Sequence, residues 1–192
     1  ELLENRRQNP YTYENEIDNY KQDHYQFHWN QKLNEKWSTN LGLNHTYGRG
    51  YFEQFREDDS IDIYGGILVS DIDQQGNQTG TTDLIRRRWL DNNFYVLNAS
   101  VNYKTSKLDL IFNSSYSTYS GDHYGEVIWA RNFSKNSSVR DRYYDGNGKK
   151  TDFSVFAKAS YLLNEKLEFY GDLQLRKLNY KTSGITSDLV NM

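Results

Sequence analysis

The sequence predicts an all-β fold, an antiparallel up-and-down meander of six long strands. Apolar and polar residues alternate over stretches of about 12 to 15 residues, against about 5 to 6 residues for an ordinary strand. These stretches come in pairs joined by short turn sequences, and long polar segments separate the pairs. A period of two sustained this far predicts a sheet with one apolar and one polar face.

The first hairpin is expected at about residues 18–50. Its first strand places three aromatic side chains on one face and amides and histidines, including His24 and His28, on the other. The aromatic residues are Tyr25, Phe27 and Trp29. The alternation resumes after a turn at 32–36, and we expect Trp29 to pair with Trp37. The two histidines, about 13 Å apart on one strand, are too distant to share a metal ion and are interpreted as polar wall residues.

The second hairpin is expected at about residues 92–120, with a two-residue turn at Thr105-Ser106 and Tyr103 opposite Leu108. The third is expected at about residues 151–182 and has the clearest alternation. With its turn at Asn164-Glu165, the expected pairs are Leu163–Leu167, Tyr161–Phe169, Ala157–Leu173 and Val155–Leu175. The tetrapeptide LNEK occurs at the tips of the first and third hairpins, which suggests that both tips lie at the same end of the molecule.

Composition excludes several classes of protein. The chain has 192 residues and is 16% aromatic, which disfavours disorder, and its net charge of −3 is too small to indicate a nucleic-acid partner. There is no cysteine, hence no disulfide or thiol nucleophile, and no apolar run long enough for a spanning helix. The N-terminus has no signal-peptide pattern, and residues 1 to about 17 are interpreted as the tail of a preceding loop.

The layout of turns and loops favours a membrane barrel. Short turns lie at one end, and long loops, at about 51–91 and 121–150, lie at the other, as in outer-membrane barrels with external loops. Rings flank an aliphatic centre in the third hairpin, as in the apolar band of such a barrel. Single-chain barrels start at about eight strands. We therefore expect residues 1–192 to be a partial transmembrane β-barrel domain, part of a larger barrel in the outer membrane.

Three segments carry a resemblance to a known family: NNFYVLNASVNYK (92–104), GDHYGEVIWAR (121–131) and TDFSVFAKASYLLNEKLEFYGDLQLR (151–176). They resemble barrel segments of TonB-dependent receptors of the Bacteroidota. The resemblance implies a 22-stranded barrel with an N-terminal plug that imports a scarce nutrient: a ferric chelate, haem, cobalamin or a glycan. It also implies a TonB complex as partner, acting through a plug domain that is absent from this chain, besides outer-membrane lipid and lipopolysaccharide.

The two long loops carry the candidate substrate-binding residues. Rings in loops stack on sugars or chelates, and adjacent guanidinium groups, as in the run RRRW, suit anionic groups. The candidates are Tyr51, Phe52, Phe55, Arg87, Trp89, His123, Tyr124 and Trp129. Loop packing and contact with lipopolysaccharide are the alternative roles. The acidic run EDDSID lacks EF-hand spacing and is interpreted as a solvated loop.

No catalytic motif is present, so the sequence predicts neither an enzyme nor a cofactor nor a metal site. Three functions remain open. The first is a nutrient receptor of the TonB-dependent type. The others are a passive outer-membrane porin, which has the same strand pattern, and a soluble β-sandwich carbohydrate-binding module, which also has one apolar face per sheet.

Overall fold

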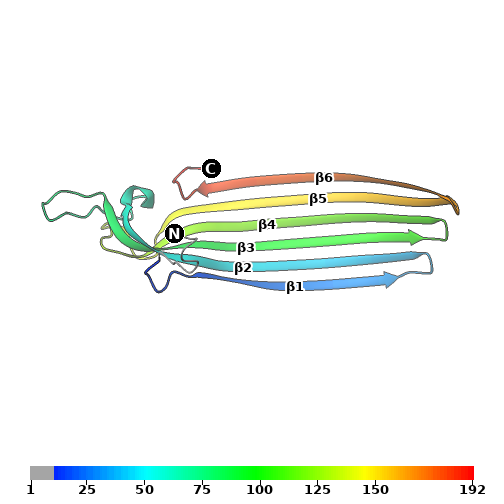
Figure 1. Cartoon of the computed structure of the whole chain (residues 1–192), viewed down its shortest axis with the longest axis horizontal. Helices are drawn as coiled ribbons and strands as arrows, with labels where there is room; N and C mark the ends of the chain where they lie inside the picture. The colour runs from blue at the N-terminus through cyan, green and yellow to red at the C-terminus, as the bar shows by residue number, and fades with distance from the viewer. Residues whose placement is uncertain (1–10) are drawn as a thin grey trace, which may run out of the picture.

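The computed structural model describes residues 11–192, which form one antiparallel sheet (Figure 1). Its elements are β1 (Asp18–Lys32), β2 (Trp37–Ser60), the short 3₁₀ helix η1 (Ile61–Tyr64), β3 (Thr81–Lys104), β4 (Leu108–Ala130), β5 (Arg142–Asn164) and β6 (Leu167–Ile185). The strands pair in chain order from β1 to β6, and the sheet is not closed. The predicted all-β, six-stranded meander is confirmed. Of the expected N-terminal loop tail, residues 1–10 lie outside the described part.

Four strands run well beyond the expected bounds. β2 continues to Ser60 and β3 begins at Thr81, while β4 continues to Ala130 and β5 begins at Arg142. The loops at this end are therefore residues 61–80 and 131–141, and the expected loops at 51–91 and 121–150 were too long. The predicted strand ends were wrong because these residues are polar, like loop residues, but still pair with the neighbouring strands. They lie beyond the apolar part of the sheet.

The three short turns share one hydrogen-bonding device. The Asn34 Oδ1 atom accepts the backbone N–H of Lys36 and of Trp37, at 2.9 Å each, and the Asn164 Oδ1 atom accepts that of Lys166 at 3.0 Å. In the middle hairpin the Thr105 Oγ1 atom accepts the backbone N–H of Lys107 and of Leu108. Side chains that accept a backbone N–H two or three residues ahead stabilise tight reversals. Both LNEK tips lie at the same end, as expected (Figure 1).

These turns decide the register. In the third hairpin the pairs Tyr161–Phe169, Ala157–Leu173 and Val155–Leu175 are as expected, but a bulge pairs Asn164, in place of Leu163, with Leu167. In the first hairpin Trp29 pairs with Leu41, so the expected Trp29–Trp37 pair was wrong by four residues. In the second, Tyr103 pairs with Leu110 and not Leu108. The turns of the first and second hairpins are centred further along the chain than expected, where the Asn34 and Thr105 side chains close them. Both shifts are even, so every side chain keeps its expected face.

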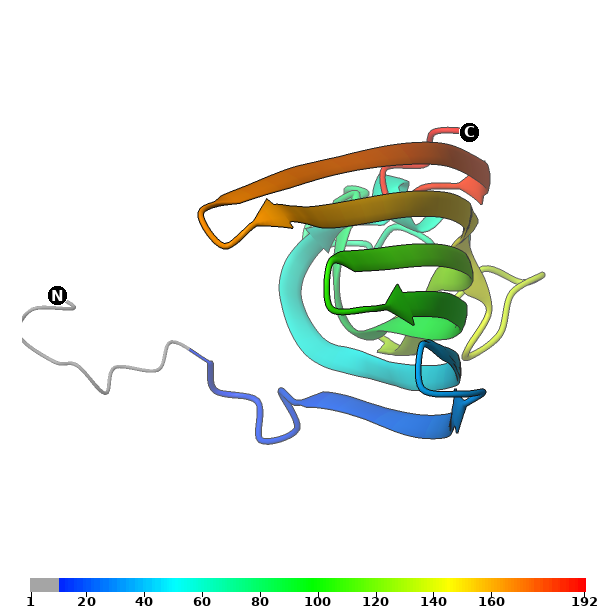
Figure 2. The same ribbon diagram turned by 90° about the vertical axis from the view of Figure 1, so that its right-hand side faces the viewer.

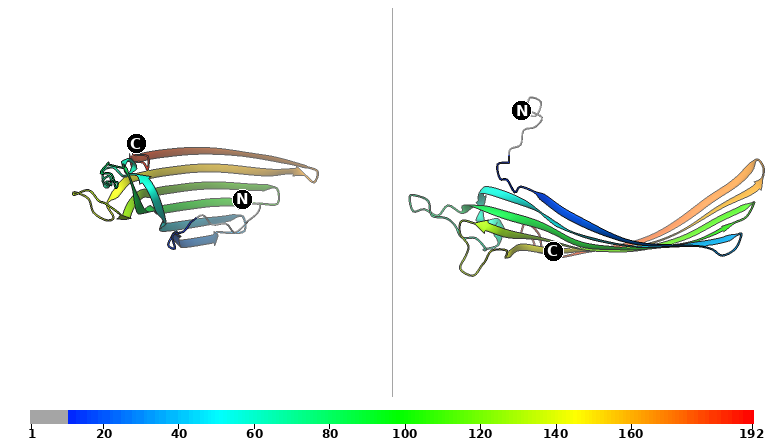
Figure 3. Two further views of the ribbon diagram at one scale, coloured as in Figure 1. Left: turned by 60° about the vertical axis from the view of Figure 1, so that its left-hand side comes forward. Right: turned by 90° about the horizontal axis from the view of Figure 1, so that it is seen from below.

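The sheet has two chemically different faces. The apolar face carries, in its half near the short turns, aliphatic and aromatic residues from every strand; the polar face carries amides, hydroxyls and glycines there. The sheet is twisted and bent into a trough, with η1 on its concave side (Figures 2 and 3). Tyr64 of η1 accepts a hydrogen bond from Arg86 of the polar face, so the polar face is the concave one.

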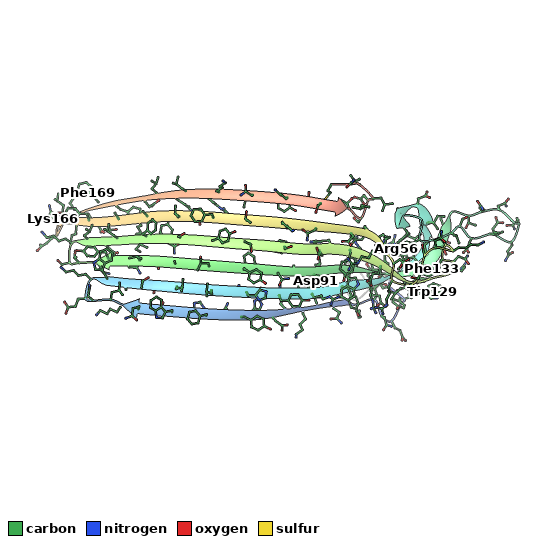
Figure 4. All side chains as sticks on the ribbon, turned by 180° about the vertical axis from the view of Figure 1, so that it is seen from behind. Arg56, Asp91, Trp129, Phe133, Lys166 and Phe169 are labelled. Carbon is green, nitrogen blue, oxygen red and sulfur yellow. The ribbon has the colours of Figure 1, made fainter. Side chains whose placement is uncertain are left out.

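The buried core lies at the loop end, not in the middle of the sheet. There η1 and its loop fold back on the strands and bury a cluster consisting of Tyr64, Ile67, Leu68, Leu84, Val127, Ala130, Tyr143 and Tyr144. Figure 4 shows the two ends: Lys166 and Phe169 mark the short turns, and Arg56, Trp129 and Phe133 mark the loop end. Elsewhere the sheet is a single layer, and its apolar side chains are exposed. Within the described residues, no helix is long and apolar enough to cross a membrane.

Candidate functional site

All eight predicted site residues lie on strands, not in loops. Tyr51, Phe52 and Phe55 belong to β2, Arg87 and Trp89 to β3, and His123, Tyr124 and Trp129 to β4. Strand alternation then divides them between the two faces. Six lie on the apolar, convex face and two, Phe52 and His123, on the polar, concave face. The structure therefore does not bring the eight together into one site.

Four of the convex-face residues form a closed network with their neighbours. The Glu53 carboxylate, 4% exposed, pairs with Arg87 at 2.7 Å, and the Arg87 guanidinium lies 4.2 Å from the centroid of the Tyr51 ring. The Tyr51 and Trp89 rings are 4.6 Å apart between centroids, and the Trp89 Nε1 atom donates to Glu126 at 3.1 Å. These contacts occupy the groups that a substrate would need.

Tyr124 completes this network and is covered by it. Its ring stacks on Trp89 at 5.8 Å between centroids, the Arg142 guanidinium lies 3.6 Å from its centroid, and only 3% of the residue is exposed. Cross-strand ring and cation–π pairs of this kind stabilise a two-sided sheet. We therefore assign this convex-face network, comprising Tyr51, Glu53, Arg87, Trp89, Tyr124, Glu126 and Arg142, to stiffening the strands beyond the apolar half.

On the concave face, tyrosine rings lie over glycines. A Cβ atom added at Gly48 would collide with Tyr20, and one added at Gly121 would collide with Tyr119. The Tyr20 hydroxyl accepts hydrogen bonds from Asn92 at 3.0 Å and from Gln22 at 3.2 Å. Glycine in a strand interior often marks the close approach of another group, here a ring folded back onto its own sheet.

The same arrangement recurs around Gly125, one residue after Tyr124. The rings of Tyr143 and Tyr144 occupy the space that a Cβ atom at Gly125 would need. This lets Tyr144, which pairs with Gly125, reach Arg88 on the far side of β4, and the Arg88 Nε atom donates to the Tyr144 hydroxyl at 3.2 Å. Arg88 also pairs across the sheet with Phe52, whose ring centroid is 5.6 Å from the guanidinium.

A cavity of about 270 Å³ opens beside Arg88 on the concave face. We name it the Arg88 pocket; it is lined by Arg88, Tyr119, His123, Tyr144, Gly146, Asn147, Gly148, Tyr180, Thr182, Ile185, Thr186, Ser187 and Met192. It combines one cation, three tyrosine rings and a glycine floor, which suits a ligand that has an anionic group and a flat apolar surface. Two larger cavities lie among aliphatic and aromatic side chains of the apolar half and belong to that surface.

Sequence reasoning found part of this pocket. His123 is one of the eight predicted site residues, whereas from the arginine run the prediction includes Arg87 and not Arg88. The sequence does distinguish the two arginines. When the alternation of the 92–104 strand is extended towards the N-terminus, Arg88 falls on the face that carries amides and Arg87 on the face that carries aromatic rings. The tyrosines of the pocket gave no such signal, because their approach depends on glycines in neighbouring strands.

The acidic run near residue 58 is part of a hydrogen-bonded end of the sheet. Asp59 accepts a hydrogen bond from Arg56 at 3.2 Å and from the Tyr64 hydroxyl at 2.7 Å. Burial opposes the charge of Asp59, but these hydrogen bonds outweigh it and lower its pKa. Burial and the bond to Asp59 together raise the pKa of Tyr64. Between residues 11 and 192, no group of three or more acidic or histidine side chains is placed to hold a metal ion.

Tyr143 differs from Tyr64 in having no hydrogen-bond partner for its hydroxyl, although it is buried. Burial raises its pKa to about 12. The Tyr64 and Tyr143 rings pack 4.8 Å apart between centroids, so Tyr143 acts in the core through its ring.

Comparisons with known proteins do not place the chain in a family. No protein-family model matches the sequence, and no curated protein matches it. The functional conclusion therefore depends on the two faces of the sheet and on the pocket.

Proposed function

We propose that this chain forms part of the wall of an outer-membrane β-barrel that binds and imports a nutrient, in the manner of the TonB-dependent receptors that its strands resemble. The observation that carries the proposal is the apolar face: a band of exposed aliphatic side chains, bounded along the strands by aromatic rows. Its function is binding and transport, without covalent chemistry.

The apolar face is arranged as a lipid-facing band would be. Near the short turns the Trp37 and Tyr103 rings contact each other at 4.7 Å between centroids. At the other border the His45 ring stacks between Tyr25 and Tyr95, at 5.8 and 4.2 Å. Between the two rows lie exposed aliphatic and aromatic residues, including Leu43, Leu97, Val101, Phe112, Leu173 and Leu175.

The height of this band fits a bilayer. From Tyr103 to Tyr95 the strand advances eight residues, which is about 27 Å along its axis. At a tilt of about 40° this corresponds to about 20 Å between ring centres along the membrane normal, close to the apolar band of about 25 Å in outer-membrane barrels. The convex-face network begins beyond the second row, where charged groups meet water and lipopolysaccharide.

The concave face is suited to line an aqueous interior. Its side chains bond to one another across strands, as Gln26 does to Asn44 at 3.2 Å and Asn40 to Ser100 at 2.9 Å. Such amides and hydroxyls would be costly against hydrocarbon and are common in barrel lumens.

The free edges of β1 and β6 also support a larger barrel. Unpaired strand edges do not occur in hydrocarbon, so in a membrane both edges would have to pair with further strands. A β-sandwich module would need a second sheet over the apolar face, and within residues 11–192 there is one sheet.

Site-directed labelling tests the proposal. The chain has no cysteine, so single cysteines report unambiguously once any cysteine elsewhere in the full-length protein is replaced. Gln75 lies in the 61–80 loop and Glu35 in the first short turn, both exposed and with no side-chain hydrogen bond to lose. Intact cells that express the full-length protein receive a membrane-impermeant maleimide. We expect labelling at Gln75→Cys and none at Glu35→Cys until the cells are broken.

Two results would contradict the proposal: labelling of both positions in intact cells, or recovery of the protein in the soluble fraction. Either would favour the carbohydrate-binding module. A passive porin would give the same labelling as a receptor. It is distinguished by nutrient uptake that persists when the proton-motive force, which drives the TonB complex, is collapsed with an uncoupler.

A further inference from the structure

Arg88 differs from the other arginines of the six strands. Every other one lies within ion-pair distance of a carboxylate: Arg49 with Asp91, Arg56 and Arg86 with Asp59, Arg87 with Glu53, Arg142 with Asp145, and Arg176 with Asp152. Among the arginines of the described strands, Arg88 alone has no carboxylate within ion-pair distance. The Asp188 carboxylate, in the segment after β6, acts on the Arg88 charge but makes no direct ion pair with it. A half-buried guanidinium with no carboxylate in direct contact is suited to bind an anion.

The Arg88 side chain is nevertheless held in place. Its Nε atom donates to Tyr144, and its guanidinium lies 5.6 Å and 5.7 Å from the ring centroids of Phe52 and Tyr144. Both Nη groups are without a hydrogen-bond partner in the described chain and are available to a carboxylate or sulfate. A guanidinium that is positioned in advance loses little entropy when it binds such a group in a bidentate manner.

The tyrosines of the pocket provide the second element. The Tyr119 ring lies over Gly121, and the Tyr180 hydroxyl is 3.5 Å from where a Cβ atom of Gly148 would be. Tyr180 belongs to the edge strand β6 and is 64% exposed. Rings that rest on the concave wall present an apolar surface to the interior, and such surfaces stack on the C–H face of pyranose rings.

The wall around the pocket provides the third element. Asn92 and Gln22 converge on the Tyr20 hydroxyl, and Thr182 lines the pocket itself. Uncharged amides and hydroxyls both donate and accept, as the hydroxyl groups of a saccharide require. A ferric chelate would use the arginine and the rings but would leave these groups without a role.

We propose that the Arg88 pocket binds an acidic oligosaccharide, whose carboxylate or sulfate pairs with Arg88 and whose pyranose rings stack on Tyr119 and Tyr180. This assignment rests on the proposed role of the concave face as the aqueous interior of a barrel. It narrows the nutrient from any scarce compound to a sugar polymer fragment that carries negative charge.

Binding is tested on the full-length protein in detergent by isothermal titration calorimetry. The probes are trigalacturonate, its methyl ester, a chondroitin sulfate tetrasaccharide, maltotriose and a ferric tricatecholate. The methyl ester has the same pyranose rings as trigalacturonate and lacks only its negative charge. The variants are Arg88→Gln, Tyr180→Leu and, as matched control, Lys181→Gln, which removes a positive charge from the opposite face next to Thr182.

We expect at least one acidic saccharide to bind about tenfold or more tightly than its uncharged counterpart. Arg88→Gln should abolish the preference for the acidic saccharide, and Tyr180→Leu should weaken the binding of all saccharides alike. Lys181→Gln should change neither the preference nor the affinity. The inference is overturned by binding of the neutral sugar or the ferric chelate only, by binding of no probe, or by acidic binding that survives Arg88→Gln.

Failure of the pocket and failure of the barrel are distinguishable. Each variant also carries Gln75→Cys or Glu35→Cys for labelling in cells. Correct one-sided labelling without saccharide binding would overturn the assigned ligand and leave the barrel standing. Two-sided labelling would overturn the barrel itself.

Discussion

Leu173 is the residue at which the membrane interpretation is most sharply tested. It lies on the apolar face and is 68% exposed. Phe169 and Lys177, on the same face of β6, lie four residues before and after it. Each interval is about 13 Å along the strand and about 10 Å along the membrane normal at a tilt of about 40°. Phe169 belongs to the ring border near the turns, and Lys177 can extend its amine to the opposite interface. In the proposed barrel, Leu173 would therefore lie close to the bilayer midplane.

An arginine on the lipid face near the midplane costs about 2 to 4 kcal/mol. Leu173→Arg should therefore lower the ratio of inserted to uninserted protein by about 30- to 700-fold, at about 1.4 kcal/mol per tenfold change. The matched control is Gln174→Arg, one position further, which places the same side chain on the polar face opposite Phe156. It should insert as the unchanged protein does.

The assay is the amount of folded protein in the outer-membrane fraction, read as the heat-modifiable band on unboiled gels. Equal loss of both variants would mean that the two faces were misassigned. If both variants insert as well as the unchanged protein, the apolar face does not contact lipid, and the barrel proposal is refuted.

Two further predictions concern the buried core at the loop end, and both use amide hydrogen exchange of η1 and its loop as the measurement, corrected for intrinsic exchange rates. Tyr143→Phe removes a buried hydroxyl that has no partner and should leave local stability unchanged or raise it by about 1 kcal/mol, whereas Tyr64→Phe removes the bonds to Asp59 and Arg86 and should lower it by about 1 to 3 kcal/mol. The reverse order would refute the hydrogen-bond assignment. Because the pKa of Asp59 lies below its ordinary value of 3.8, its ionised form stabilises the fold above about pH 4, and this contribution is lost as the pH falls through the lowered pKa. In Asp59→Asn, the amides of η1 and its loop should be less protected from exchange at pH 7, and acidification should lower their protection little further. If acidification lowers the protection of this variant as much as that of the unchanged protein, the acid sensitivity belongs to another group.

Within the three predicted hairpins, alternation alone was enough to identify the strands and the face of each side chain. Tyr25, Phe27 and Trp29 share the apolar face, and the third hairpin pairs as expected through Tyr161–Phe169. The reason is that the period of a strand is two, so the face follows from parity and survives the even register shifts in the other two hairpins. The number of strands and their order followed from the same pattern.

Strand ends and the site were not determined in this way. Beyond the apolar band both faces of a strand carry polar residues, so residues 51–60 and 121–130 had the composition of loops and the pairing of strands. Membership of the pocket depends on contacts between strands: Tyr144 reaches Arg88 only because Gly125 lies between them. Parity in the sequence assigned the side chains of the hairpins to a face, but a bulge at the loop end puts Trp129 on the face opposite to its parity. Only the tertiary structure decided which residues of a face meet, because pairing register and the space left by glycines are properties of neighbouring strands.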